Sequence, residues 1–217
     1  MEDKKINTKI LKPKLDNNLN NIELFSEDIV DEAIFSLGKI VDCSLENYEA
    51  DRINFKQVLF KNVVFNNITF RRIEMVDVIF ENCDLSNVDF MEASLHKVEF
   101  INCKIIGTNL SESTLRNVIF ENCNGEYAFF NYSNLKQVAF SQCQLRSSDF
   151  QNSIFSKVEF QECNLLETQM NFTSLKGIDF TSCDIEGMAV NINDVKGVIV
   201  TTMQAVYLST LMGIIIK

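Results

Sequence analysis

The sequence lacks the usual marks of an enzyme. It contains no glycine-rich phosphate loop and no group of residues with metal-ligand spacing, and its single histidine is His96. No cysteine or serine partner is implied for His96, which follows Leu95 and precedes Lys97, so we expect a solvated side chain rather than a catalytic base. We therefore expect no enzymatic activity, no cofactor and no bound metal.

Export and membrane signals are also missing. The first five residues, Met1 to Lys5, lack the apolar core of a signal peptide, and no apolar run approaches the length of a membrane-spanning helix. Seven cysteines are an odd number in a chain without an export signal, which favours buried thiols over a disulfide framework. We expect a soluble, cytoplasmic protein that does not associate with membranes.

Basic residues are few. Twenty lysines and arginines stand against thirty acids, which gives a net charge of −10 and a pI of about 4.7. Direct nucleic-acid binding requires clustered basic side chains, so this balance argues against it. It favours a basic partner, or simply solubility.

What the sequence does contain is a five-residue repeat that runs without insertion over residues 41–200. Large apolar residues recur at positions divisible by five, and a compact residue stands two positions before most of them. Examples are Val58 before Phe60 and Val98 before Phe100. A helix repeats its apolar face every 3.6 residues and a strand every two, so a period of five indicates a repeat architecture instead.

A second period of twenty residues lies above the first. All seven cysteines share one column, in which Val63 takes the one missing step: Cys43, Cys83, Cys103, Cys123, Cys143, Cys163 and Cys183. Phenylalanine also recurs every twenty residues from Phe60 to Phe180. Four blocks therefore form one coil, and equivalent residues stack on successive coils at the strand spacing of about 4.8 Å. This predicts an all-β, four-sided β-solenoid of about eight coils, in which inward cysteines act as small hydrophobes.

At this point the sequence resembles the pentapeptide-repeat proteins, whose blocks contain a small residue, a polar residue, Leu or Phe, and two polar residues. Cys83-Asp84-Leu85-Ser86-Asn87 and Cys163-Asn164-Leu165-Leu166-Glu167 follow this pattern closely. The resemblance implies a right-handed quadrilateral β-helix. Because no loop projects between coils, the chain is most similar to the loopless Gram-positive and mycobacterial Qnr-like members. Those relatives bind DNA gyrase and topoisomerase IV as DNA mimics and counter quinolones.

The N-terminal residues fall outside the regular repeat. Residues 1–21 are polar and contain the only proline, so we expect a flexible tail. Residues 22–40 fit the repeat poorly but retain apolar side chains, and we expect them to cap the open end of the solenoid.

Residues 201–217 are expected to form a C-terminal cap. Thr201 or Thr202 can cap a short helix, Gly213 suits its end, and the last three isoleucines look like one more strand. Four apolar residues should share one face of this helix, namely Met203, Val206, Tyr207 and Leu211. In the resembling proteins such a segment pairs two monomers, so the resemblance implies a homodimer through this C-terminal segment.

Inward polar positions are expected to satisfy buried polar groups with hydroxyl hydrogen bonds. They are Thr108, Ser113, Ser133, Ser153, Thr168 and Thr173. Gly125 replaces a large residue between Ile105 and Leu145, which predicts a gap or a backbone bulge. A local kink that neighbours repack is favoured there over a small-molecule cleft.

Acidic residues are unevenly distributed over the predicted faces. Between Phe55 and Ile199, one face carries seven bases against three acids, whereas the other three carry fifteen acids against five bases. We expect the acidic faces to bind a partner through Glu81, Asp84, Glu99, Glu121, Glu126, Glu159, Glu162 and Asp179. A straight rod of acids could occupy a basic DNA-binding groove in place of phosphates, although surface acids also serve simply to keep a β-rod soluble.

Three functions therefore stay open. The first is a non-enzymatic DNA mimic that binds type II topoisomerases and either modulates them or protects them from quinolones. The second is an interaction scaffold with an unknown partner, bound through the exposed aromatic residues Tyr127, Phe129, Tyr132 and Phe172. The third is a small-molecule binder at the Gly125 irregularity.

Overall fold

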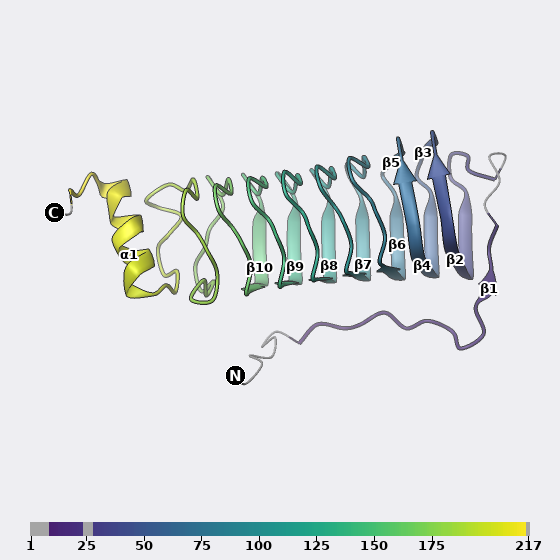
Figure 1. Cartoon of the computed structure of the whole chain (residues 1–217), viewed down its shortest axis with the longest axis horizontal. Coiled ribbons are helices and arrows are strands. Elements are labelled where there is room, and N and C mark those ends of the chain that lie inside the picture. The colour runs from purple at the N-terminus through teal and green to yellow at the C-terminus, as the bar shows by residue number, and fades with distance from the viewer. Residues whose placement is uncertain (1–8, 24–27, 216–217) are drawn as a thin grey trace.

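The computed structural model describes residues 9–23 and 28–215. They form a β-solenoid with a short helix at its C-terminal end, and an extended N-terminal segment lies along the rod (Figure 1). The strands are β1 (Asn20–Asn21), β2 (Ile34–Glu46), β3 (Glu49–Asp51), β4 (Asn54–Asn66), β5 (Thr69–Arg71), β6 (Glu74–Glu81), β7 (Ser94–Ile101), β8 (Thr114–Glu121), β9 (Asn134–Ser141) and β10 (Ile154–Gln161). Helix α1 (Thr202–Ser209) and the 3-10 turn η1 (Thr210–Met212) follow.

Successive coils pair in parallel with a constant offset of twenty residues. The large sheet has the order β1-β2-β4-β6-β7-β8-β9-β10, and β3 pairs separately with β5. Phe60 lies opposite Phe80, and Phe80 lies opposite Phe100. After β10 the register continues as isolated bridges as far as Asp179 with Ile199. This register confirms the solenoid predicted from the two periods.

Each coil has four sides, which we name from the coil that runs from Phe55 to Met75. Face A spans residues 55–60, face B 60–65, face C 65–70 and face D 70–75, and residues that differ by multiples of twenty share a face. Strands β6 to β10 lie on face A. We use these names below.

Stacked phenylalanines fill the interior. Neighbouring rings in the column Phe60, Phe80, Phe100, Phe120 and Phe140 lie 4.7–4.9 Å apart between centroids and within 5° of parallel. All five side chains are at most 1% exposed. The ring spacing matches the strand spacing of about 4.8 Å, so backbone pairing and aromatic stacking reinforce each other along the rod.

Inward thiols and hydroxyls bond to backbone carbonyls of the preceding coil. The Cys123 thiol donates to the Phe100 carbonyl oxygen at 3.3 Å, and the Ser133 hydroxyl donates to Leu110 O at 2.7 Å. Thr108, Ser113, Ser153, Thr168 and Thr173 also donate to backbone carbonyls. The expectation that these groups satisfy buried polar atoms is confirmed.

Most blocks place the second residue after the large inward one at positive φ. Asn tolerates this left-handed conformation better than most residues. On face B, four successive coils carry asparagine at this position, from Asn62 to Asn122, and each asparagine bonds to the next. Asn102 donates to Asn82 at 3.2 Å, and Asn122 donates to Asn102 at 2.8 Å. The turn requirement and the side-chain ladder thus favour the same residue.

Gly125 neither opens a cleft nor makes a bulge. Its N–H donates to Gln144 O at 2.6 Å in regular register, and Gly125 itself is buried. A Cβ atom built on Gly125 would stand 3.0 Å from Leu145 and 3.1 Å from Ile105, so these side chains already fill the space. The predicted gap and bulge are wrong. Because there is no gap at Gly125, there is no basis for a small-molecule cleft at this position.

The solenoid starts earlier than expected. Strand β2 pairs with β4 from Ile34 onward in the twenty-residue register, so Ile34 to Ile40 belong to the first coil rather than to a cap. Ile22 lies against Gly38, where a Cβ atom would overlap its side chain. The next coils, from Val58 to Val158, carry an inward valine in this column, so Ile22 fills the place that this valine takes in them.

The C-terminal cap forms, with two corrections. Thr201 caps α1 in a capping box with Gln204, and Gly213 ends η1 with φ of 72°. Leu208 and Leu211 pack against the core, whereas Met203 is 76% exposed and Val206 is 40% exposed, so the predicted apolar face is split. No strand forms at residues 214–215, and Ile216 lies outside the described residues.

Candidate binding surfaces

The N-terminal segment is an extended strap along face A. The sequence predicts a flexible tail over residues 1–21, but residues 9–19 lie along the rod and lead into β1 (Figure 1), while residues 1–8 lie outside the described residues. Lys9 O accepts a hydrogen bond from Gln137 Nε2 at 2.8 Å, and Leu11 N donates to Asn117 Oδ1 at 3.1 Å. Lys14 N donates to Asp77 Oδ1 at 2.9 Å. The strap therefore contacts coils that are far from it in sequence.

This strap removes Glu99 from the expected acidic surface. The Glu99 carboxylate is 3.1 Å from Lys12 Nζ, and its side chain is only 8% exposed. The oxygen nearest Lys12 is Oε1, which is buried and makes no hydrogen bond in the described part of the chain, so the contact is an ion pair. The prediction that Glu99 contributes to an exposed partner-binding face is wrong, because the strap covers this carboxylate.

Two other predicted acids are engaged by cations of neighbouring coils. Glu81 pairs with Lys61 at 2.8 Å, and Asp84 pairs with Lys104 at 3.3 Å. The hydrogen bond that Lys61 donates to Glu81 raises the pKa of Lys61. These pairs lie between coils, where they help to hold the stack together, and they reduce the negative charge available to a partner.

The remaining acids gather on the C-terminal half of faces B and C. Glu121 and Glu162 are exposed on face B, and Glu126 is half-buried on face C. From Glu121 to Glu186 these two faces carry seven acids and one base, Arg146, which pairs with Glu167 at 2.8 Å. Two further predicted acids, Glu159 and Asp179, lie on face A. The structure thus narrows the acidic surface to about half the rod.

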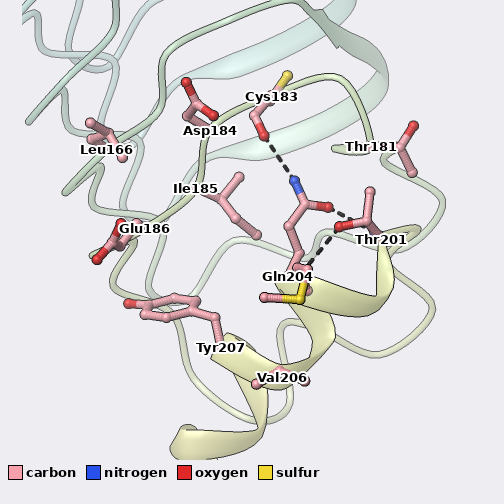
Figure 2. Close-up of a pocket in the computed structure, with 11 residues that line it drawn as sticks. Leu166, Thr181, Cys183, Asp184, Ile185, Glu186, Thr201, Gln204, Val206 and Tyr207 are labelled. Carbon is pink, nitrogen blue, oxygen red and sulfur yellow. Dashed lines mark hydrogen bonds between the residues drawn. The ribbon is translucent and has the colours of Figure 1, made fainter.

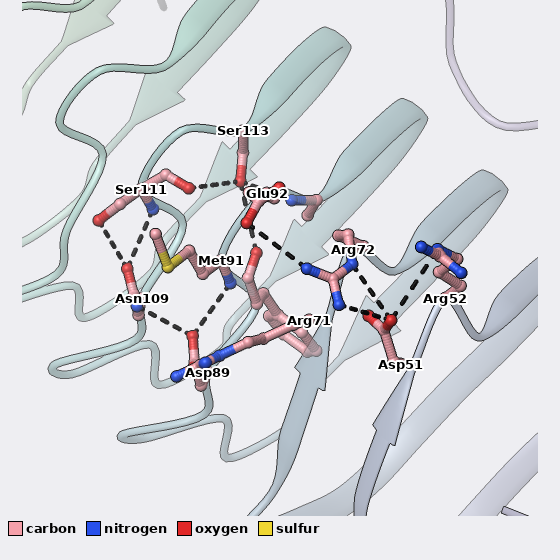
Figure 3. A network of polar contacts seen from close by, with 12 residues as sticks. Asp51, Arg52, Arg71, Arg72, Asp89, Met91, Glu92, Asn109, Ser111 and Ser113 are labelled. Carbon is pink, nitrogen blue, oxygen red and sulfur yellow. Dashed lines mark hydrogen bonds and ion pairs between the residues drawn. The ribbon is translucent and has the colours of Figure 1, made fainter. Parts of the chain in front are cut away.

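The N-terminal part of faces C and D carries a paired-charge network (Figure 3). Arg72 Nη2 lies 2.6 Å from Asp51 Oδ2, and Arg71 Nε lies 2.7 Å from Asp89 Oδ2. The hydrogen bond from Arg72 lowers the pKa of Asp51. Because both signs are present and paired, this end offers a partner little net charge.

The aromatic residues form the second candidate surface. Tyr127, Phe129, Tyr132 and Phe172 are 56%, 43%, 62% and 69% exposed. Tyr127, Tyr132 and Phe172 adopt φ of about 60°, a conformation that is unfavourable for bulky residues. Other coils place mostly Asn or Gly at the position of Tyr127, and mostly Glu or Arg at the position of Tyr132 and Phe172. The left-handed conformation at these positions therefore does not by itself select an aromatic residue.

A groove lies between α1 and the last coil (Figure 2). It has a volume of about 820 Å³, and its lining includes Asp184, Glu186, Met203, Val206 and Tyr207. Gln204 closes its inner side by donating to Phe180 O and Cys183 O, both at 2.8 Å. The groove is wide and open, and it contains no arrangement of nucleophile and base.

The cysteine column and His96 are the other groups with reactive side chains. Hydrogen bonding within the thiol column raises the pKa of Cys83 and of Cys143 and lowers the pKa of Cys123 and of Cys163, so the thiols of this column do not share one direction of shift. His96 is half-buried rather than fully solvated, and burial lowers its pKa. Among the described residues there is no group of three or more potential metal ligands. In the same part of the chain, no helix is long and apolar enough to cross a membrane.

The repeat geometry agrees with a match to a protein-family model. The model described as the pentapeptide repeat region matches residues 93–170 and 133–208, which together span more than half of the chain. The chain belongs to the pentapeptide-repeat family. A second model, the SV2A/B/C luminal domain, matches residues 23–110. No curated protein has a significant sequence match.

Several solved structures of pentapeptide-repeat proteins are similar to this chain. HetL from Nostoc sp. strain PCC 7120, involved in heterocyst differentiation regulation, is 14% identical, with 78% of this chain and 90% of HetL covered and a TM-score of 0.40. Full-length QnrB1, a plasmid-mediated fluoroquinolone resistance protein, is 17% identical, with coverages of 82% and 100% and a TM-score of 0.34. A protein of the Arabidopsis thaliana thylakoid lumen is 24% identical, with coverages of 59% and 75% and a TM-score of 0.30.

Sequence reasoning missed the strap, although a signal was present. The column of face A that includes Glu99 also contains the outward residues Ile119 and Ala139, which a solvated face would not require. In the structure they are 5% and 0% exposed. An apolar stretch on an outward column, together with apolar residues in a polar N-terminal segment, would have pointed to a covered face.

Proposed function

We propose that this chain is a non-catalytic binding protein whose acidic faces B and C contact the basic DNA-binding surface of a type II topoisomerase. The observation that carries the proposal is the excess of acids over bases on these faces from Glu121 to Glu186. A basic groove that normally binds phosphates is attracted to regularly spaced carboxylates for the same electrostatic reason. The resemblance to Qnr-like proteins supplies the partner class. This function implies a cytoplasmic location.

A supercoiling assay with DNA gyrase and topoisomerase IV tests the proposal directly. Purified protein is added with and without a fluoroquinolone at two salt concentrations. We expect inhibition or relief from the drug, and a weaker effect at higher salt because screening reduces attraction between charges. If the protein has no effect at either salt concentration when it is present at about ten times the concentration of the enzyme, the proposal is contradicted.

Charge reversal identifies the surface. The variant E121K/E162K reverses two exposed acids of face B and should raise the half-effective concentration at least about tenfold, since each reversal replaces attraction by repulsion. E112K changes an exposed acid on face D and serves as the matched control. Equal loss in both variants would point to net charge rather than to faces B and C.

The aromatic surface supports a second candidate, an interaction scaffold with a different partner. Tyr127, Tyr132 and Phe172 keep bulky side chains at positive φ, where a smaller residue would fit with less strain. If this surface binds the partner, Y132N/F172N should lose a cross-linked complex that E121K/E162K retains. The two double variants therefore separate the two functions.

We also propose a homodimer through the C-terminal end. Met203 and Val206 are exposed on α1, and Ile192 and Ile199 are exposed on the last coil beside it. An apolar surface at the open end of a solenoid is stabilised when a second copy covers it. Sedimentation should show a dimer that M203D/V206D converts to a monomer, whereas the charged control E112K should stay dimeric.

A further inference from the structure

We propose that face A is a binding groove for an extended, lysine-containing peptide, and that residues 9–16 occupy this groove as an internal ligand. The ligand from another molecule would be a segment of the same chemistry on a partner protein. The proposal does not depend on the acidic surface of faces B and C. It rests on three features of the strap contact: the backbone bonds, the buried carboxylate and the apolar floor.

The groove binds the main chain of the strap. Asp77, Asn117 and Gln137 occupy one column of face A, and each bonds to a backbone atom of the strap. Leu11 and Lys14 bond to coils two steps apart, which is a rise of about 10 Å at the strand spacing, and three residues of extended chain span that length. Two steps of the coil repeat therefore match three residues of an extended peptide in length. Recognition of the backbone in this way tolerates many sequences.

One side chain adds selectivity. Glu99 is 6% exposed beneath the strap, and Lys12 Nζ is 3.1 Å from its carboxylate. A buried carboxylate without a cation is strongly unfavourable, so a peptide that lacks a positive residue at this point would bind less well. Arg116 and Lys136 are exposed on the same face, which disfavours a peptide that is basic along its whole length. The preferred ligand has a lysine opposite Glu99.

The floor of the groove is apolar. Ile119 and Ala139 point outward from face A, yet they are 5% and 0% exposed. In the strap, Ile10, Pro13 and Leu15 are half-buried. Burial of apolar surface on both sides supplies binding energy that does not depend on an exact sequence, as in other grooves that bind extended peptides.

The contacts of the strap allow another peptide to replace it on face A. The backbone of residues 9–16 bonds to side chains of face A and does not form a continuous β-ladder with the backbone of that face. Asn17 and Asn18 lie in an exposed bend after this segment. Beyond the bend, β1 pairs with β2, and Ile22 fills the space at Gly38. A cut in the bend would therefore release the strap while the cap of the first coil stays in place.

The test uses the full chain with a protease site inserted between Asn17 and Asn18. After folding and cleavage, a fluorescent peptide with the sequence of residues 9–17 is added, and its anisotropy is followed. We expect saturable binding to the cleaved protein and at least about tenfold weaker binding to the uncut protein, where the attached strap competes. A scrambled peptide of the same composition is the control ligand.

A charge swap makes the assignment specific. The substitution E99K should abolish binding of the natural peptide to the cleaved chain, and a peptide carrying K12E should restore it. E121K, which changes an exposed acid on face B, should leave binding unchanged. If the cleaved strap dissociates and neither peptide binds, or if E99K and E121K have equal effects, the proposal is overturned.

Discussion

The carboxylate of Glu99 lies 3.1 Å from the ammonium group of Lys12, and the ion pair joins the N-terminal strap to the middle of the solenoid. Burial of a carboxylate is costly, and the nearby cation only partly offsets that cost. The ordering of each strap residue also opposes the contact, by about 1–2 kcal/mol of backbone entropy. The free energy that holds the strap on face A is therefore a small difference between large opposing contributions. Single substitutions should change the stability of this contact noticeably.

The first prediction concerns the hydrogen bond from the Leu11 amide to Asn117. In N117A this amide loses its acceptor, so its hydrogen exchange should become at least several-fold faster, in line with a net bond contribution of about 1 kcal/mol. N122A is a matched control, because Asn117 and Asn122 have φ of 55° and 53° and both substitutions place alanine in the same strained conformation. Equal exchange of Leu11 in both variants would contradict the strap contact.

The second prediction concerns the phenylalanine column. Phe100 stacks between Phe80 and Phe120 and is 1% exposed, so F100A should lower the free energy of unfolding by about 3–5 kcal/mol through a cavity that the rigid coils cannot close. Chemical denaturation measures this loss. F129A removes a ring that is 43% exposed and should cost far less. A similar loss in both variants would show that the column does not dominate stability.

The third prediction concerns Gly125, where the repeat pattern and the structure disagree. The pattern favours leucine, but Leu145 and Ile105 already fill the site. G125L should therefore destabilise the protein by about 1–3 kcal/mol through overpacking. The double variant G125L/L145A should recover part of this loss by making room. Stabilisation by G125L alone would restore the gap that the sequence predicts.

The fourth prediction concerns Phe172, which has φ of 63° and is 69% exposed. F172N should raise the free energy of unfolding by up to about 1 kcal/mol, because asparagine accepts the left-handed conformation more readily. Thermal denaturation checks the change, and F129N, at a position without positive φ, should show no such gain. Stabilisation together with lost partner binding would indicate that the aromatic ring serves function rather than folding.

The fifth prediction concerns the only histidine. Burial, followed by the positive charges of Lys97 and Arg116, lowers the pKa of His96 below its usual value of about 6.5. The unfolded chain therefore binds the proton more readily than the folded chain, so stability should fall as the pH drops below about 6.5 and level off below the folded pKa. NMR titration of the single imidazole measures this pKa. The variant H96Q should remove this part of the pH dependence, and an NMR midpoint above 6.5 would refute it.

The candidate surfaces could be predicted only in part. The aromatic positions Tyr132 and Phe172 follow from their outward places in the repeat, and the structure finds both exposed. The burial of Glu99 could not be predicted in the same way, because it depends on a segment that is far away in sequence and covers this side chain. Periodicity places a side chain inward or outward. It does not state what lies above it.

The sequence alone determined the solenoid, because a side chain repeated every five and every twenty residues can be buried only if equivalent residues stack. The phenylalanine and cysteine columns, the hydroxyl hydrogen bonds and the helix cap at Thr201 all follow from local pattern. Only the tertiary structure decided the rest: that residues 9–16 lie on face A, that Ile22 replaces the missing side chain at Gly38, and that Leu145 fills the space at Gly125. These contacts join residues without a common period, so packing in three dimensions alone selects them.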